Sequence, residues 1–122
     1  MVTVGQSMLT LEEFSNILFE KKTVVLEESA LENVAINYHF LQHFSSDKLI
    51  YGINTGFGPM AQYRVEKENL LQLQYNLIRS HSSGSGRLLP VHLGRALMIA
   101  RLNSLMQGYS GVHPEVDRKS VV

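Results

Sequence analysis

The sequence predicts a mainly α-helical protein with a small β component. Apolar residues recur at the three- and four-residue spacing of a helix face in four stretches, namely residues 11–20, 29–44, 65–81 and 90–107. Only two short runs, 23–26 and 49–51, have the β-branched or aromatic character of strands. A length of 122 residues suits one domain, so we expect residues 1–122 to fold as a single unit.

A capping box predicts where the first helix, residues 11–20, begins. Thr10 and Glu13 stand three residues apart, so that each side chain can accept a hydrogen bond from the backbone of the other. The apolar face of this helix is Leu11, Phe14, Ile17 and Leu18. The short β run at 23–26 follows it.

A second capping box, Ser29 with Glu32, predicts a helix from residue 29 to about Phe44. Its apolar side is Leu31, Val34, Ala35, Tyr38 and Leu41. Polar residues 45–47 end it, and the run 49–51 predicts a short strand that leads into a glycine-rich loop at 52–59.

The second half of the chain predicts two longer helices and the start of another. Residues 65–81 form the first, and the serine- and glycine-rich segment 82–86 ends it. Pro90 suits a first helical turn, and Gly108 stops the helix that runs to about residue 107. This helix is apolar nearly all round, so we expect it to be buried on several sides and to favour a homo-oligomer. Pro114 begins a further helix, and we expect 114–122 to be its truncated start.

Composition excludes several classes of function. The 11 basic residues balance the 11 acidic ones, so no net charge attracts nucleic acid or anionic lipid. The longest apolar run, 96–100, is far shorter than the ~20 residues that cross a bilayer. The first ten residues lack the basic and apolar parts of a secretory signal, and the absence of cysteine favours a reducing compartment. We therefore expect a cytoplasmic protein with no nucleic acid or membrane partner.

Three local patterns are incomplete versions of known sites. His39 and His43 have the spacing of two metal ligands on one helix, but no third ligand is near, so we expect no metal. The glycines at 56–58 and 84–86 complete neither GxGxxG nor a P-loop, which argues against nucleotide binding. Residues 80–82 put hydroxyls beside an imidazole, but the GxSxG elbow of serine hydrolases is absent.

Tyr51 and His81 remain as candidate functional residues. Tyr51 precedes a loop in which Gly52, Gly56 and Gly58 allow backbone conformations closed to other residues. By local physics alone, the structural interpretation is favoured over the functional one: a tyrosine in a strand usually packs, and a histidine at a helix C-terminus usually complements the helix dipole. From these residues alone, both interpretations stay open.

Several short sequence motifs resemble those of the aromatic amino-acid ammonia-lyases. The resemblance lies in YGINTGFG at 51–58 and LQYNLIRSHSSG at 73–84, and it continues with RLNSL at 101–105 and GYSG at 108–111. These blocks occur in the order of the family and are spread over residues 51–111, roughly half of the chain. The N-terminal helices are compatible with the opening segment of the family.

The resemblance implies the N-terminal segment of the fumarase/aspartase-like helical ammonia-lyase fold. The family comprises carbon–nitrogen lyases, usually cytoplasmic homotetramers, that release ammonia from histidine, tyrosine or phenylalanine. Their electrophile is a methylidene-imidazolone (MIO) formed from an internal Ala-Ser-Gly, which these 122 residues lack. We therefore expect an N-terminal fragment that is inactive alone.

The resemblance also implies roles for individual residues. Tyr51 matches the family tyrosine that takes the β-proton from the substrate. The loop after it would close over the substrate, with a hinge at Gly52, Gly56 and Gly58. His81 would face the substrate side chain. The Ser80–His81 pair resembles the corresponding residues of histidine ammonia-lyases. This resemblance implies a role in histidine catabolism, with urocanate as the product. Residues 59–64 and 72–84 also resemble a bacterial tyrosine-specific branch, so the substrate stays open.

A different class of function competes with the enzyme. The chain could be a non-catalytic helical remnant that acts as a structural or binding module. An Ala-Ser-Gly encoded downstream of Val122 would favour the enzyme, and a genuine stop would favour the remnant.

Overall fold

The computed structural model describes residues 1–119, and their packing forms two compact units. Unit 1 consists of Met1–Leu41 and the residues from Leu88 onward, and unit 2 of Gln42–Arg87. The predicted fold class, mainly α with a small β component, is confirmed. The expectation that residues 1–122 form a single domain stays a prediction.

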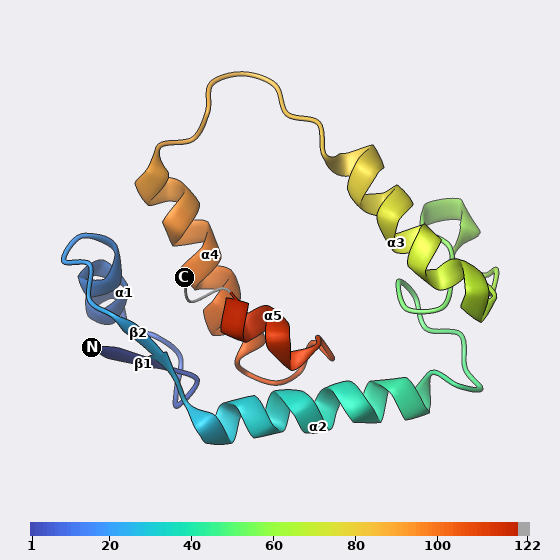
Figure 1. The fold of residues 1–122 in the computed structure, drawn as a ribbon, viewed down its shortest axis with the longest axis horizontal. Coiled ribbons are helices and arrows are strands. Elements are labelled where there is room, and N and C mark those ends of the chain that lie inside the picture. The colour runs from blue at the N-terminus through green and yellow to red at the C-terminus, as the bar shows by residue number, and fades with distance from the viewer. Residues whose placement is uncertain (120–122) are drawn as a thin grey trace. The chain divides into compact units, whose positions relative to one another are not determined.

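Unit 1 contains the small β component. Strand β1 (Val2–Val4) pairs in parallel with β2 (Val24–Leu26), so that Val2 lies opposite Val24 (Figure 1). The predicted run at 23–26 is therefore a strand. The sequence did not predict β1, because three residues are too few to show an alternating pattern. The side chains of Val2 and Val4 are buried in the hydrophobic clusters of this unit.

Helix α1 (Leu11–Leu18) has the capping box that the sequence predicts. Glu13 donates its backbone N–H to Thr10 Oγ1 at 3.2 Å, and Thr10 donates its own to Glu13 Oε2 at 2.9 Å. The Thr10 backbone N–H, and then its hydroxyl, hold the pKa of Glu13 below its usual value. The helix ends two residues earlier than predicted, and of its apolar face only Ile17 is buried.

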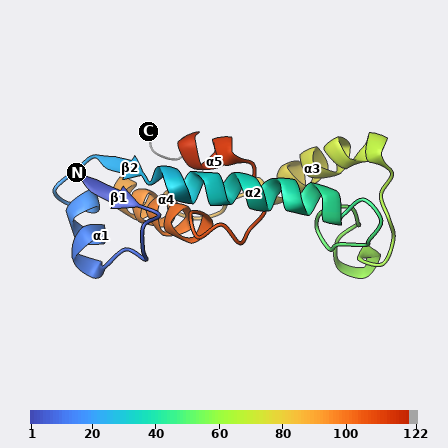
Figure 2. The ribbon, with the colours of Figure 1, turned by 90° about the horizontal axis from the view of Figure 1, so that it is seen from below.

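Helix α2 (Glu28–Phe44) begins differently from the prediction. Ser29 lies inside the helix, and its hydroxyl donates to Glu27 Oε1 at 3.4 Å, so the predicted capping box with Glu32 is wrong. The strand pairing sets the start instead, because Glu27 donates its N–H to the Val4 carbonyl at 2.9 Å. β2 therefore leads directly into α2, as Figure 2 shows.

The core of unit 1 lies between the strands, α1, α2 and the C-terminal half of α4 (Val91–Leu105). Its two clusters are Val4, Ala30, Leu31, Leu102 and Met106, and Val2, Ile17 and Ile99. Within this chain, helix α4 is buried only along its C-terminal half, and the expectation that partners bury its other sides stays a prediction. Its N-terminal half is open, with Val91 75% and Leu97 62% exposed.

Helix α5 (Pro114–Lys119) begins at the predicted proline, and the rest of the expected helix start at 114–122 lies outside the described residues. Asp117 of this helix is fully buried, and within residues 1–119 neither of its carboxylate oxygens has a hydrogen-bond partner. Burial raises the pKa of Asp117, because a charged carboxylate loses its hydration there.

Unit 2 contains helix α3 (Lys67–His81) and a short 3₁₀ helix, η1 (Gly58–Met60). Helix α3 begins two residues later than predicted and ends at the predicted residue. None of the described hydrophobic side chains of unit 2 is buried. Its buried side chains are the polar Asn54 and Thr55, which lie in the loop before α3.

Candidate functional site

The chain turns back at the position where the sequence predicted a strand. Residues 51–54 form a turn, in which the Ile50 carbonyl accepts from the N–H groups of Ile53 and Asn54 at 3.1 and 3.2 Å. The predicted strand at 49–51 is therefore wrong. Its backbone groups bond within the turn, so they are not available to a neighbouring strand.

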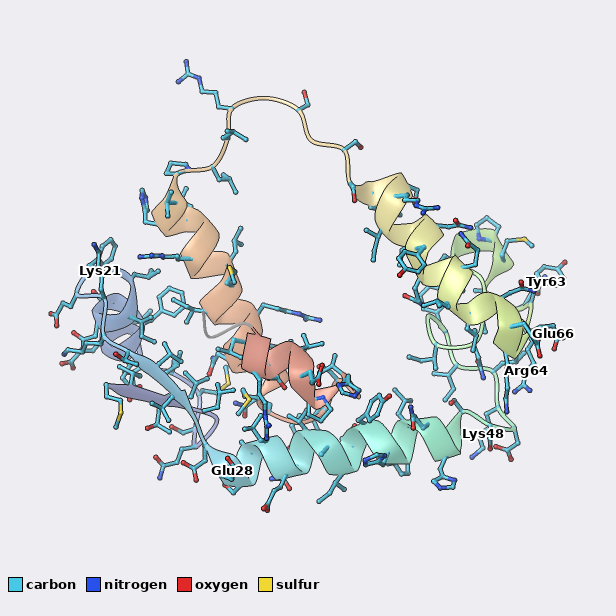
Figure 3. The ribbon with its side chains drawn as sticks, in the orientation of Figure 1. Lys21, Glu28, Lys48, Tyr63, Arg64 and Glu66 are labelled. Atoms are coloured by element: carbon cyan, nitrogen blue, oxygen red, sulfur yellow. The ribbon has the colours of Figure 1, made fainter. Side chains whose placement is uncertain are left out.

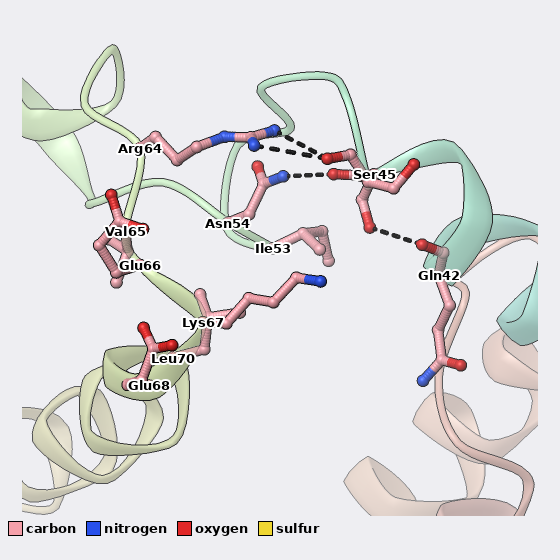
Figure 4. Close-up of a pocket in the computed structure, with 11 residues that line it drawn as sticks. Gln42, Ser45, Ile53, Asn54, Arg64, Val65, Glu66, Lys67, Glu68 and Leu70 are labelled. Atoms are coloured by element: carbon pink, nitrogen blue, oxygen red, sulfur yellow. Dashed lines mark hydrogen bonds between the residues drawn. The ribbon is translucent and has the colours of Figure 1, made fainter.

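Asn54 organises this turn. Its side chain is 7% exposed and donates through Nδ2 to the carbonyls of Ser45 and Lys48, both at 2.7 Å. Its Oδ1 accepts from the N–H of Ile50 at 2.8 Å. Figure 4 shows the bond from Asn54 to Ser45. One amide thus ties three backbone positions before the turn to the loop after it.

The loop then pairs with the segment that leads into α3. Thr55, which is 1% exposed, forms an isolated antiparallel bridge with Arg64. The bridge is extended by the bonds from the N–H of Gly56 to the Tyr63 carbonyl at 3.2 Å and from that of Val65 to the Asn54 carbonyl at 2.9 Å. Both ends of the loop are therefore fixed by backbone hydrogen bonds.

The Arg64 guanidinium extends toward the chain that follows α2. It donates to the Ser46 carbonyl at 3.4 Å, as Figure 4 shows, and to the Lys48 carbonyl at 3.1 Å. Figure 3 labels Arg64 and Lys48. These bonds and those of Asn54 converge on the same short segment. Local composition could have indicated a turn at Asn54, because asparagine favours turns with side-chain-to-backbone bonds, but it does not identify the carbonyls that Asn54 and Arg64 contact.

Tyr51, the predicted catalytic residue, is the first residue of the turn. Its side chain is 63% exposed, and its ring makes an edge contact with Phe57 at 6.0 Å between centroids. Its hydroxyl oxygen accepts a long hydrogen bond, 3.5 Å, from the N–H of Gly58. The phenol is therefore accessible and has one backbone donor beside it.

The three predicted hinge glycines differ in what the structure requires of them. Gly52 and Gly58 have φ of 78° and 54°, which favour glycine. Gly56 is needed for space, because a Cβ there would lie 2.6 Å from the Cβ of Met60. Their role as a hinge stays a prediction.

His81, the predicted substrate-facing residue, is the last residue of α3 and is exposed. Its Nδ1 lies 2.9 Å from the Leu77 carbonyl and 3.0 Å from Ser80 Oγ. With Nδ1 held by the helix, Nε2 is the ring nitrogen that can face a ligand. Among residues 1–119 no hydrogen bond or ring contact joins His81 to Tyr51.

A cavity of about 290 Å³ lies beside the loop, and neither Tyr51 nor His81 lines it. Its lining residues are Gln42, Ser45, Ser46, Ile53, Asn54, Arg64, Val65, Glu66, Lys67, Glu68 and Leu70 (Figure 4). The charged ones are all exposed, and Asn54 and Arg64 are bonded to backbone carbonyls. Within residues 1–119 no three His, Asp or Glu side chains are grouped as metal ligands.

Comparison with known proteins identifies related sequences and folds. The family model described as "Aromatic amino acid lyase" matches residues 9–121. Over 117 residues, 95% of this chain, the sequence is 40% identical to a probable histidine ammonia-lyase of Thermoplasma volcanium and 38% identical to the histidine ammonia-lyase of Bacillus subtilis.

The same match covers 24% and 23% of those two relatives, so the chain spans about a quarter of their length. Among solved structures, tyrosine aminomutase from Streptomyces globisporus superposes with a TM-score of 0.90 at 32% identity. That superposition covers 98% of this chain and 23% of the aminomutase. The fold is therefore the one that this region has in the aminomutase.

Proposed function

The chain belongs to the aromatic amino acid lyase family, and we propose that it is the part of such an enzyme that provides the catalytic Tyr51 and the substrate-facing His81. The proposed reaction is the release of ammonia from an aromatic amino acid. Histidine is the first candidate substrate, and its product would be urocanate. The observation that carries the proposal is the open phenol of Tyr51, on an ordered turn within the motif that resembles the family.

Tyr51 has the accessibility that a general base needs. Removing a β-proton requires a base within hydrogen-bond reach of the substrate carbon, and 63% of the Tyr51 side chain is open to solvent. The Gly58 N–H at 3.5 Å is a donor that can stabilise negative charge on the phenol oxygen. A phenol enclosed among apolar side chains could not take this role.

The MIO group of the family does not fit the residues present here. It forms from an Ala-Ser-Gly, and that tripeptide does not occur in these 122 residues. This chain therefore supplies the base and the substrate contact but not the electrophile, and we propose that it is inactive alone. In an enzyme of family length, the group would activate the substrate toward proton loss.

His81 is proposed to contact the side chain of the substrate. A positioned imidazole distinguishes substrates that offer a hydrogen-bond partner from those that do not. The relatives named histidine ammonia-lyases favour histidine, and the superposition on tyrosine aminomutase favours tyrosine and an aminomutase as the second candidate.

The proposed enzyme is a cytoplasmic homo-oligomer. Support for an oligomer comes from α4, where Val91, Leu97 and Met98 are each at least half exposed in this chain. Within residues 1–119, no helix combines the length and the apolar character needed to span a membrane.

A chimaera tests the proposed function. In it, the matching 117 residues of this chain replace the corresponding region of the Bacillus subtilis histidine ammonia-lyase, and the rest of that enzyme is kept. We expect the chimaera to release ammonia from histidine or tyrosine, and this 122-residue chain alone to form no urocanate, coumarate or cinnamate. A folded chimaera that is inactive on histidine, tyrosine and phenylalanine would contradict the proposal.

Substrate choice is tested in the same chimaera. His81→Leu should change the ratio of kcat/KM for histidine and tyrosine by at least tenfold, because it removes a hydrogen-bonding group. The control is His43→Leu, which removes another exposed imidazole, at the C-terminal end of α2. Equal ratios in both variants would remove His81 from the proposal.

A further inference from the structure

We propose that Asn54 and Thr55 are positioning residues that fix the backbone on both sides of Tyr51 and so determine where its phenol lies. This inference rests on the proposed role of Tyr51, but the geometry is a property of the loop itself. It gives the two buried polar side chains of unit 2 a function beyond packing.

The two peptide groups that flank Tyr51 are both held by side chains. The N–H of Ile50, before Tyr51, donates to Asn54 Oδ1 at 2.8 Å. The N–H of Gly52, after it, donates to Thr55 Oγ1 at 3.4 Å. Asn54 and Thr55, which are neighbours in the sequence, thus hold the peptide groups on both sides of Tyr51. The bond to Asn54 is the shorter of the two and therefore the stronger.

The two side chains are themselves anchored. The side-chain Nδ2 of Asn54 donates to the carbonyls of Ser45 and Lys48, and the main-chain carbonyl of Asn54 accepts from the N–H of Val65. The Thr55 hydroxyl donates to the Gly56 carbonyl at 2.9 Å. Because both side chains are more than nine-tenths buried, solvent does not compete for these bonds.

The chemistry of each position is specific. Asn54 acts as an acceptor and a double donor at once, which an amide can do and a carboxylate cannot. Thr55 accepts from one peptide and donates to another, which needs a hydroxyl. Valine has nearly the shape of threonine and lacks both functions, so Thr55→Val isolates the hydrogen bonds from the packing.

The phenol depends on this backbone support because the ring has few contacts of its own. The Tyr51 side chain is 63% exposed, its ring makes an edge contact with Phe57, and its hydroxyl accepts the long bond from the Gly58 N–H. An exposed ring with so little packing is placed mainly by its backbone. A general base displaced by about 1 Å can lose about a hundredfold in rate, so a loosened turn should lower turnover.

Amide hydrogen exchange, followed by NMR in the 122-residue chain, tests the proposal directly. Thr55→Val should speed exchange at Gly52 by about threefold to tenfold, the effect of one lost hydrogen bond. Thr55→Ser, which keeps the hydroxyl, should restore the slow exchange. Asn54→Leu should speed exchange at Ile50, and circular dichroism reports whether this variant stays folded. The control is Ser46→Ala, which removes a side-chain bond to the His43 carbonyl in the same unit.

The chimaera supplies the catalytic readout. Thr55→Val should lower kcat at least tenfold with KM within twofold, and Thr55→Ser should recover most of kcat. The proposal is overturned if Ile50 and Gly52 exchange at the parent rate in the valine and leucine variants, or if Thr55→Ser behaves like Thr55→Val. A different outcome is altered exchange at Ile50 and Gly52 together with turnover that does not depend on Tyr51. It would confirm that Asn54 and Thr55 hold the backbone, and it would overturn the proposed function instead.

Discussion

Unit 1 and unit 2 are stabilised by different interactions. Within the described residues, unit 1 buries ten hydrophobic side chains from its strands, α1, α2 and α4. Unit 2 buries none, and the side chains that it does bury, Asn54 and Thr55, are polar and hydrogen-bonded to backbone. Apolar burial thus stabilises the first unit, and a network of polar bonds orders the second.

The expected site residues all belong to unit 2. Tyr51, His81 and the three glycines lie on segments whose hydrophobic side chains are exposed or only partly buried. Such segments open at low free energy, and functional loops are commonly drawn from them. The comparison teaches that the site depends on local hydrogen bonds, whereas the helical scaffold depends on its core.

The largest expected effect contrasts the apolar core of unit 1 with unit 2, which has none among its described residues. Leu102→Ala in unit 1 removes a side chain that is 2% exposed and should lower the free energy of unfolding by about 2–4 kcal/mol. Leu71→Ala in α3 removes one that is 68% exposed and should cost less than about 0.5 kcal/mol. Urea denaturation measures both. Equal costs would mean that unit 2 has an apolar core, and would break the comparison.

The second effect concerns close packing in the loop of unit 2. Gly56→Ala places a Cβ 2.6 Å from Met60 Cβ and should destabilise the unit by about 1–3 kcal/mol. Gly84→Ala is the matched control, because nothing lies within 4 Å of its Cβ. Limited proteolysis between residues 42 and 87 reports the difference. A loop that tolerates both changes would not be ordered as described.

A third effect is the pH dependence of unit 1. The raised pKa of Asp117 means that the folded state binds its proton more tightly than the unfolded chain does. The carboxyl therefore destabilises the fold as the pH rises through the raised pKa. Asp117→Asn should add about 1 kcal/mol of stability near pH 7 and almost none below the ordinary Asp pKa of ~3.9. A gain that is the same at both pH values in thermal unfolding would contradict this.

The smallest effect is at the start of α1. Thr10→Ala removes the cap and should cost about 1 kcal/mol at pH 7. Because the pKa of Glu13 is lowered in the folded state, the contribution of the box is present above its ordinary pKa and is lost as the pH falls. Thermal unfolding at neutral and acidic pH should show the cost of Thr10→Ala shrinking on acidification. The same cost at both would show that the carboxylate is not part of the cap.

Sequence patterns predicted the helices better than their beginnings. The box at Thr10 and Glu13 is present, whereas the one at Ser29 and Glu32 is replaced by strand pairing at Glu27, which is a tertiary effect that the local sequence does not show. The all-apolar pattern of α4 predicted burial, but the described residues cover only its C-terminal half.

The candidate site was predictable in part. The resemblance selected Tyr51, but the run at 49–51 predicted a strand, because β propensity does not include the turn that the Asn54 side chain imposes. The buried bonds of Asn54 and Thr55 depend on backbone groups up to nine residues away, and no spacing rule identifies them.

Turnover of the chimaera with Tyr51→Phe and with Tyr63→Phe tests the central claim most directly. Each change removes one phenol oxygen from an exposed ring of unit 2, since Tyr51 is 63% and Tyr63 54% exposed. We predict that Tyr51→Phe lowers kcat by about 10²–10⁴, the contribution of a general base, with folding unchanged, and that Tyr63→Phe stays near the parent value. Equal turnover in the two variants would contradict the assignment of Tyr51 as the base.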